Sequence, residues 1–156
     1  MLGRTYDNQV CSLARALEVL GERWTLLALR EVLLGQRRFD QIVQQTGASR
    51  DILAARLRKL VDAGLLERRQ YEQHPPRYEY HPTDAAKQLH MVLLTLMDWG
   101  DRHITAGPPP TVWEHSCGHE LHAKVVCEHC GQPVELGESR PVRLGGQPAE
   151  RTVSNG

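Results

Sequence analysis

The sequence predicts an α+β fold in which helices predominate and one β-hairpin follows the fourth helix. Three observations support this prediction: apolar residues recur at helical spacing over the first hundred residues, glycines follow successive helical segments, and two β-prone segments are joined through prolines. A chain of 156 residues, 40% hydrophobic and 24% charged, has the size and composition of one folded domain with a small appendage. The length excludes a large multidomain enzyme.

Four helices are predicted before the hairpin. Their residue ranges are 10–20, 24–34, 39–46 and 50–63, and each is followed by a glycine. The glycine after the third range, Gly47, leaves only Ala48 before Ser49. Ser49 is a suitable N-cap because its hydroxyl can accept a hydrogen bond from an unpaired amide in the next helix. The apolar stripe expected on that fourth helix consists of Leu53, Leu57, Leu60 and Val61.

A hairpin and a long helix complete the folded part. The β-prone segments are residues 65–71 and 77–81, and the loop 72–76 between them contains two prolines. Thr83 is expected to cap a fifth helix that runs to about His103 and serves as a dimerisation helix. The predicted domains are therefore a first domain over 1–106, a small module over 107–137 and a flexible tail over 138–156.

This order of elements is typical of a winged helix-turn-helix. In that fold the helix after the tight turn enters the major groove of DNA, and the hairpin contacts the neighbouring backbone. The charge distribution agrees with it locally, because residues 37–77 contain nine basic and five acidic residues, a net charge of +4, whereas the whole chain has a formal net charge of +0. The sequence therefore predicts a DNA-binding surface confined to this region.

Four stretches of the sequence are similar to one known family. They are Cys11, residues 20–42, residues 49–83 and the DWGDRH segment at 98–103. Over roughly the first two thirds of its length, the chain resembles the HxlR-type, MarR-like winged-helix transcriptional regulators of bacteria. The resemblance implies a homodimer that binds a partly palindromic operator. The usual Leu-Thr before the last helix is Pro82-Thr83 here, a departure at the start of the dimer helix and away from the DNA-facing surface.

The candidate DNA-binding residues fall into two groups. Arg50 and Arg58 are expected to reach base edges, because a guanidinium fork pairs with guanine O6 and N7, and Ser49 and Asp51 lie beside them. The expected phosphate contacts are Arg37, Arg38, Arg56, Lys59, His74 and Arg77. Any one of these side chains could instead be solvated or form an ion pair within the protein, and strand alternation leaves the direction of Arg68 open.

A second signal lies in residues 111–137. Cys127 and Cys130 form a C-x2-C pair followed by glycine, which is typical of a zinc knuckle, and Cys117 is also followed by glycine. With a strand expected at 125–126, the segment predicts a zinc-ribbon-like β module. His115 is favoured as the fourth ligand of a structural Zn²⁺, with His119 as the alternative. The other interpretations are a reduced, metal-free hairpin and a Cys127–Cys130 disulfide.

Cys11 and the tryptophans have two interpretations each. The resemblance implies that Cys11 could be a redox sensor, whereas a lone cysteine on an apolar helix face is more often a small buried hydrophobic residue. Trp24, Trp99 and Trp113 are expected first in packing, although a tryptophan near a dimer helix could line a pocket for a small-molecule effector.

The sequence as a whole favours a DNA-binding regulator over an enzyme. It contains no nucleophile-and-base pattern, glycine-rich phosphate loop or paired-carboxylate motif. No apolar run is long enough for a membrane span, and the start of the chain lacks a secretory pattern, so we expect a cytoplasmic protein. The alternatives are a thiol redox protein that uses Cys127 and Cys130, and a winged-helix adaptor that no longer binds DNA.

Overall fold

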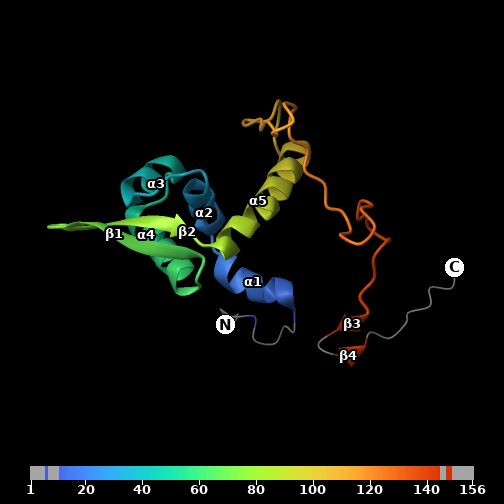
Figure 1. Cartoon of the computed structure of the whole chain (residues 1–156), viewed down its shortest axis with the longest axis horizontal. Helices are drawn as coiled ribbons and strands as arrows, with labels where there is room; N and C mark the ends of the chain where they lie inside the picture. The colour runs from blue at the N-terminus through green and yellow to red at the C-terminus, as the bar shows by residue number, and fades with distance from the viewer. Residues whose placement is uncertain (1–5, 7–10, 145–146, 149–156) are drawn as a thin grey trace. The chain divides into compact units, whose positions relative to one another are not determined.

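Five helices and an antiparallel hairpin account for most of the structure, a computed structural model that describes residues 6, 11–144 and 147–148 (Figure 1). The helices are α1 (Ser12–Leu20), α2 (Thr25–Leu33), α3 (Phe39–Thr46), α4 (Arg50–Asp62) and α5 (Asp84–His103). The hairpin consists of β1 (Leu66–Gln73) and β2 (Pro76–Pro82), and a short second pair consists of β3 (Arg143–Leu144) and β4 (Gln147–Pro148). The order confirms the predicted winged helix-turn-helix. None of the described helices is long and apolar enough to cross a membrane.

Contacts within the chain define two units. One is Ala16–Ala123, which contains α2 to α5, the hairpin and the segment that follows α5. The other combines Met1–Arg15 with Lys124–Gly156. Residues 145–146 and 149–156 of the predicted tail lie outside the described residues. The predicted domain boundaries at 106/107 and 137/138 stay predictions.

The core of the larger unit lies between α2 and α4. Ala28, Leu29 and Val32 of α2 have no exposed surface, and Leu53, Leu57 and Leu60 of α4 are equally buried. Burying a leucine side chain completely contributes about 1.5–3 kcal/mol to stability. Ile42 from α3, Leu66 from β1 and Ala86 from α5 extend the same cluster. The core therefore fixes α4 against α2, and the opposite face of α4 is left exposed.

The corner between α3 and α4 uses a glycine and a threonine. Gly47 ends α3 at φ 71°, a left-handed conformation that glycine adopts without strain, and its N–H donates to Val43 O. The Thr46 hydroxyl donates to Ile42 O over 2.8 Å. Ser49 occupies the N-cap position with extended backbone angles, but its side chain makes no capping hydrogen bond. The predicted N-cap position of Ser49 is therefore correct, but the predicted hydrogen bond to its hydroxyl is not made.

The wing is longer than the sequence predicts. Its strands pair from Leu66 with Pro82 out to Gln73 with Pro76, with a β-bulge between Gln70 and Glu72. Only His74 and Pro75, joined by a cis peptide bond, connect the strands. The predicted loop 72–76 was too long, because Pro76 can occupy a strand position that requires no amide hydrogen. At the root of the wing, the Tyr80 N–H donates to Arg37 O over 2.8 Å.

The long helix α5 starts as predicted. Thr83 Oγ1 accepts a hydrogen bond from the Ala86 N–H and also donates to Gly64 O over 2.9 Å, so the cap ties α5 to the end of α4. Leu93 and Leu94 are buried on one side of the helix. Four large apolar side chains on α5 are at least half exposed: Met91, Val92, Leu96 and Trp99.

The structure does not show the predicted zinc-ribbon-like β module. Residues 107–137, all of them described, contain isolated bridges and no strand. The valine pair expected to start a strand makes a bridge from Val126 to Pro133 and one hydrogen bond from the Val134 N–H to Val125 O. Pro133 offers no amide hydrogen to extend this pairing.

Candidate nucleic-acid interface

A groove of about 620 Å³ lies between the wing and the first turns of α3 and α4. The side chains that line it come from three elements that are distant in the sequence. They are Arg38, Phe39, Asp40, Gln41, Arg50, Arg68, Tyr71, Pro76, Arg77, Tyr78 and Tyr80. Four of these eleven are arginines and one is acidic, so the groove attracts anions.

Aromatic rings hold three of the four arginines in place. The Arg38 guanidinium carbon lies 4.8 Å from the Tyr71 ring centroid, and that of Arg68 lies 3.5 Å from the Tyr78 ring centroid. Arg50 is 4.9 Å above the ring of Phe39. A guanidinium stacked on a ring keeps its N–H donors at its edge, where they can bind a phosphate or a base. The groove therefore presents arginines whose orientations are already restricted.

Three of these arginines also have carboxylate partners. Arg38 Nε lies 3.5 Å from Glu79 Oε1. Arg50 Nη1 lies 2.7 Å from Asp40 Oδ1, and Arg77 Nε lies 3.2 Å from Glu72 Oε2. The last two pairs are largely exposed, so each contributes little to stability and can exchange partners readily.

Three predicted phosphate contacts lie elsewhere and have partners in the protein. Arg37 donates to Val32 O at the end of α2. Arg56 forms an ion pair with Glu22, and Lys59 Nζ lies 2.5 Å from the other oxygen of the same carboxylate. The hydrogen bond from Lys59 lowers the pKa of Glu22, and the positive charges of Arg56 and Lys59 lower it further.

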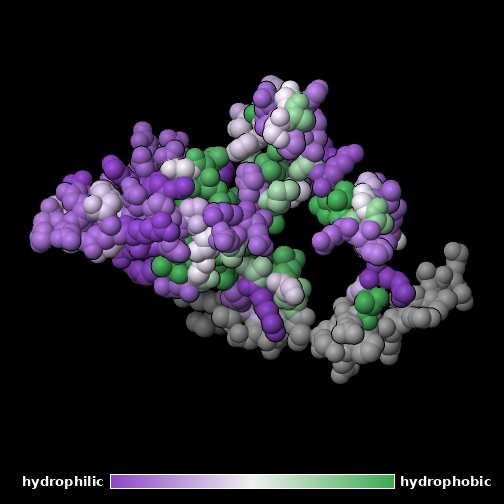
Figure 2. Space-filling view, in the orientation of Figure 1, coloured by the Kyte–Doolittle hydropathy of each residue, from purple (hydrophilic) through white to green (hydrophobic). Residues whose placement is uncertain are grey.

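The remaining predicted residues are exposed near the groove. Ser49, Asp51 and Arg58 lie on the exposed face of α4, and His74 is at the tip of the wing. The field of Arg58 reaches Tyr80, where burial raises the pKa of the phenol while Arg68 and Arg58 oppose that rise. Figure 2 shows the wing and the neighbouring surface as predominantly hydrophilic.

Sequence reasoning missed Tyr71 and Tyr78 and left Arg68 undecided. Arg68 is two residues after the buried Leu66 and shares its face of the strand, which predicts an inward direction. The wing extends beyond the helices (Figure 1), so the same face opens into the groove at Arg68. The alternation of side chains along β1 therefore predicts the correct face for Arg68. The sequence does not show how far the core extends along the strand.

Two short turns carry the candidate metal ligands, one in each unit. In the first, Gly118 has φ 81°, the Cys117 N–H donates to His115 Nδ1 over 3.4 Å, and His119 Nδ1 lies 3.1 Å from Cys117 O. In the second, Gly131 has φ 72° and its N–H donates to Cys127 O over 2.7 Å. Hydrogen bonds from the Cys130 and His129 amides lower the pKa of the Cys127 thiol.

No group of three or more His, Cys, Asp or Glu side chains arranged to hold a metal ion occurs among the described residues. All four cysteines are reduced. The side chain of Cys11, just before α1, is exposed, so the expectation of a buried hydrophobic cysteine is wrong.

The protruding hairpin, the exposed helix after a tight turn and the arginine-lined groove define the winged helix-turn-helix class of DNA-binding proteins. The model of the HxlR-like helix-turn-helix family matches residues 19–108, and the chain belongs to that family. An uncharacterized HTH-type transcriptional regulator of Mycobacterium bovis is 43% identical over 132 residues, which cover 83% of this chain and 84% of the relative.

Solved structures give the same result. The crystal structure of PA1607, described as a candidate transcription factor, aligns with a TM-score of 0.74 and 30% identity over 84% of this chain and 93% of its own. The oxidized form of the redox regulator HypR aligns with a TM-score of 0.56 and 26% identity over 62% of this chain and 100% of its own. The protein is therefore a DNA-binding transcriptional regulator and not an enzyme.

Proposed function

We propose that the protein binds a partly palindromic operator as a homodimer, with one α4 helix from each subunit in the major groove. The observation that carries this proposal is the arginine-lined groove, which lies directly beside the exposed N-terminal turn of α4. Half-sites bound by two such helices lie about one helical turn apart, ~34 Å. A redox or small-molecule signal that alters the angle between the DNA-binding regions of the two subunits would then alter the affinity for the operator.

The groove geometry supports the following proposal for the contacts. Arg50 and Arg58, with Ser49 and Asp51, are proposed to face base edges, because they lie on the exposed side of α4. The proposed phosphate contacts are Arg38, Arg68, Arg77 and His74. Arg37, Arg56 and Lys59 are reassigned to structural roles, since each lies outside the lining of the groove and has a partner in the protein.

The proposed dimer contact is a stripe on α5. Val92, Leu96 and Trp99 fall within about 60° of one another when the helix is wound at ~100° per residue, and each is 50–51% exposed. The ring of His103 continues the stripe, with its centroid 5.4 Å from that of Trp99. Exposed apolar side chains aligned along a helix are typical of a face that packs against another helix.

The decisive experiment is to measure which genomic fragments the purified protein retains at two salt concentrations. Retention of a few related sequences that survives the higher salt supports an operator-specific regulator. Retention without sequence preference, with a steep salt dependence, would contradict specific regulation. If replacing both Arg50 and Arg58 by alanine leaves retention unchanged, the non-DNA-binding adaptor becomes the better account.

We also propose a structural Zn²⁺ held by Cys117, Cys127, Cys130 and one histidine. The two turns have the local form of zinc knuckles, each with a left-handed glycine directly after a cysteine. The carbonyl oxygen of Cys117 can only accept a hydrogen bond, so His119 Nδ1 must donate to it, which leaves His119 Nε2 unprotonated in the neutral ring. His115 Nδ1 instead accepts from the Cys117 amide. His119 is therefore preferred to His115.

Metal content of the purified protein tests this assignment. About one zinc per chain is expected, and His119→Ala should lower the content while His115→Ala leaves it unchanged. The reverse pattern would make His115 the preferred fourth ligand. Near-zero metal in a reduced preparation would contradict the proposed zinc site. The thiol redox alternative has less support, because it requires a helix starting at Cys127 and residues 107–137 contain none.

Cys11 is proposed as a redox input to the regulator. It is exposed, and one structural relative is a redox regulator. Hydrogen peroxide would convert its thiol to a sulfenic acid and release water. Peroxide should then weaken operator binding by the protein but not by the Cys11→Ser variant.

The proposed target of the regulator is chromosomal DNA. The proposal therefore places the protein in the bacterial cytoplasm.

A further inference from the structure

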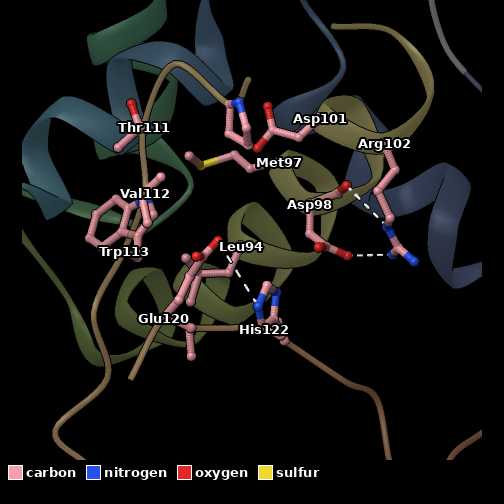
Figure 3. Close-up of a pocket in the computed structure, with 13 residues that line it drawn as sticks. Leu94, Met97, Asp98, Asp101, Arg102, Thr111, Val112, Trp113, Glu120 and His122 are labelled. Carbon is pink, nitrogen blue, oxygen red and sulfur yellow. Dashed lines mark hydrogen bonds and ion pairs between the residues drawn. The ribbon is translucent and has the colours of Figure 1, made fainter. Parts of the chain in front are cut away.

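A pocket of about 220 Å³ lies between the second half of α5 and residues 109–123 (Figure 3). All of its lining residues belong to the unit Ala16–Ala123. Eight of its thirteen lining residues lie beyond residue 108, where the match to the family model ends. The pocket is on the side of α5 away from the proposed dimer stripe.

One wall of the pocket is apolar and aromatic. Met97 and Leu94 from α5 lie near Val112 and Trp113 of the following segment, and Leu121 also lines the pocket. The Trp113 ring is held edge-on against His90, with centroids 5.8 Å apart. Its Nε1–H is buried and has no hydrogen-bond acceptor among the described residues. A flat, apolar compound fits such a wall.

Three carboxylates also line the pocket, those of Asp98, Asp101 and Glu120. Asp98 is paired with Arg102 one turn further along α5. Asp101 accepts a hydrogen bond only from the Thr105 hydroxyl, at 3.4 Å, and Glu120 lies 4.0 Å from His122 Nε2. Neither of these two carboxylates has an arginine or lysine partner within 4 Å in the described part of the chain. The pocket therefore combines negative charge with the aromatic surface.

We propose that this pocket binds a small organic cation, an amine attached to one or two aromatic rings. The rings would lie against Trp113 and Met97, and the ammonium group would be neutralised by Asp101 and Glu120. An anionic ligand is disfavoured, because it would meet these two carboxylates, and the one arginine among the described lining residues, Arg102, is paired with Asp98. The pocket volume of 220 Å³ is below the ~300–1,000 Å³ of pockets that bind drug-sized ligands, so the ligand should be smaller than a typical drug.

This inference deepens the proposed function, on which it rests, by naming the chemical class of the effector. A ligand that bridges α5 to residues 109–123 would fix the helix that carries the proposed dimer stripe. Binding of the cation and retention of DNA are separate measurements, so a failure of one is distinguishable from a failure of the other.

The test compares three probes of matched shape by titration calorimetry on the full chain. The probes are tryptamine, a cation; tryptophol, a neutral alcohol; and indole-3-propionate, an anion. Tryptamine is expected to bind at least about tenfold more tightly than tryptophol, with indole-3-propionate the weakest. Equal binding of all three, tighter binding of the anion, or no binding of tryptamine would each overturn the proposal.

Variants locate the site. Replacing Asp101 by Asn together with Glu120 by Gln should weaken tryptamine binding about tenfold and leave tryptophol unchanged. The control Glu114→Gln removes a carboxylate from the same segment but outside the pocket, and should change neither. Trp113→Leu should weaken both probes. Undiminished tryptamine binding to the Asp101/Glu120 double variant would exclude this pocket.

Discussion

Arg50 Nη1 and Asp40 Oδ1 lie 2.7 Å apart and join the first turn of α4 to the first turn of α3 across the groove. In the free protein, the arginine proposed to read bases is thus already bound to a carboxylate. DNA would have to replace that carboxylate, and Asp40 also places a negative charge in the surface proposed to receive phosphates.

Removing this carboxylate should therefore strengthen DNA binding. Asp40→Asn is expected to raise operator affinity about 2- to 5-fold, because an exposed pair contributes up to about 1 kcal/mol and its loss frees Arg50. The measurement is a fluorescence-anisotropy titration with an operator duplex. Asp84→Asn, on α5 and outside the groove, is the matched control. Weaker binding by Asp40→Asn would show that Asp40 positions Arg50 for DNA and does not compete with it.

Two neighbouring wing arginines provide a comparison of the strand faces. Arg68 lines the groove, whereas Arg69 is absent from the lining and is paired with Glu67. Arg68→Ala should weaken DNA binding and reduce the slope of log K against log salt by about 0.9, the value for one phosphate contact. Arg69→Ala should change neither quantity appreciably. Equal effects of the two variants would contradict the assignment of the groove.

If the apolar stripe on α5 forms the dimer interface, a single charge introduced into the stripe should disrupt the dimer. Leu96→Glu would bury an unpaired carboxylate in the interface, so the dimer dissociation constant should rise at least about 100-fold. Sedimentation velocity measures this directly. Lys87→Glu places the same residue elsewhere on the exposed surface of α5 and should leave the dimer intact. A Leu96→Glu protein that remains dimeric would place the interface on another surface.

Glu22 predicts an acid-sensitive contribution to stability. Its pKa is lowered in the folded protein, so its stabilisation is complete above the pKa of the unfolded chain and is lost as the pH falls through the folded pKa. Glu22→Gln should lower the free energy of unfolding by up to about 1 kcal/mol at pH 7, because the group is partly exposed. Urea unfolding of both proteins should show a difference at pH 7 that decreases as the pH falls below the usual glutamate pKa of 4.5 and through the lowered folded pKa. A difference independent of pH would contradict the ion-pair explanation.

Gly47 and Gly100 form a matched pair of glycines. A Cβ at either position meets no atom within 4 Å, but Gly47 has φ 71° and Gly100 lies within α5. Gly47→Ala should therefore destabilise the fold by about 1–2 kcal/mol through backbone strain alone. Gly100→Ala should stabilise it by about 0.5–1 kcal/mol, because alanine restricts the unfolded chain more. Thermal unfolding measures both, and the same sign for the two variants would exclude this account of the helix-turn-helix corner.

The sequence alone determined the helices, their ends and the winged order of elements. Periodic leucines such as Leu53 and Leu57 and a cap such as Thr83 act within one or two turns of chain, so their effects can be read from local spacing. The family resemblance and the local positive charge then predicted the DNA-binding face.

The tertiary structure alone decided which cations remain available for DNA. Glu22 holds Arg56 and Lys59 from more than thirty positions away, and Arg68 reaches the groove because the wing extends beyond the core. The pocket behind α5 likewise exists because residues 109–123 fold back onto the helix. Each of these features depends on contacts between segments that are distant in the sequence. The spacing of residues along the chain does not predict such contacts.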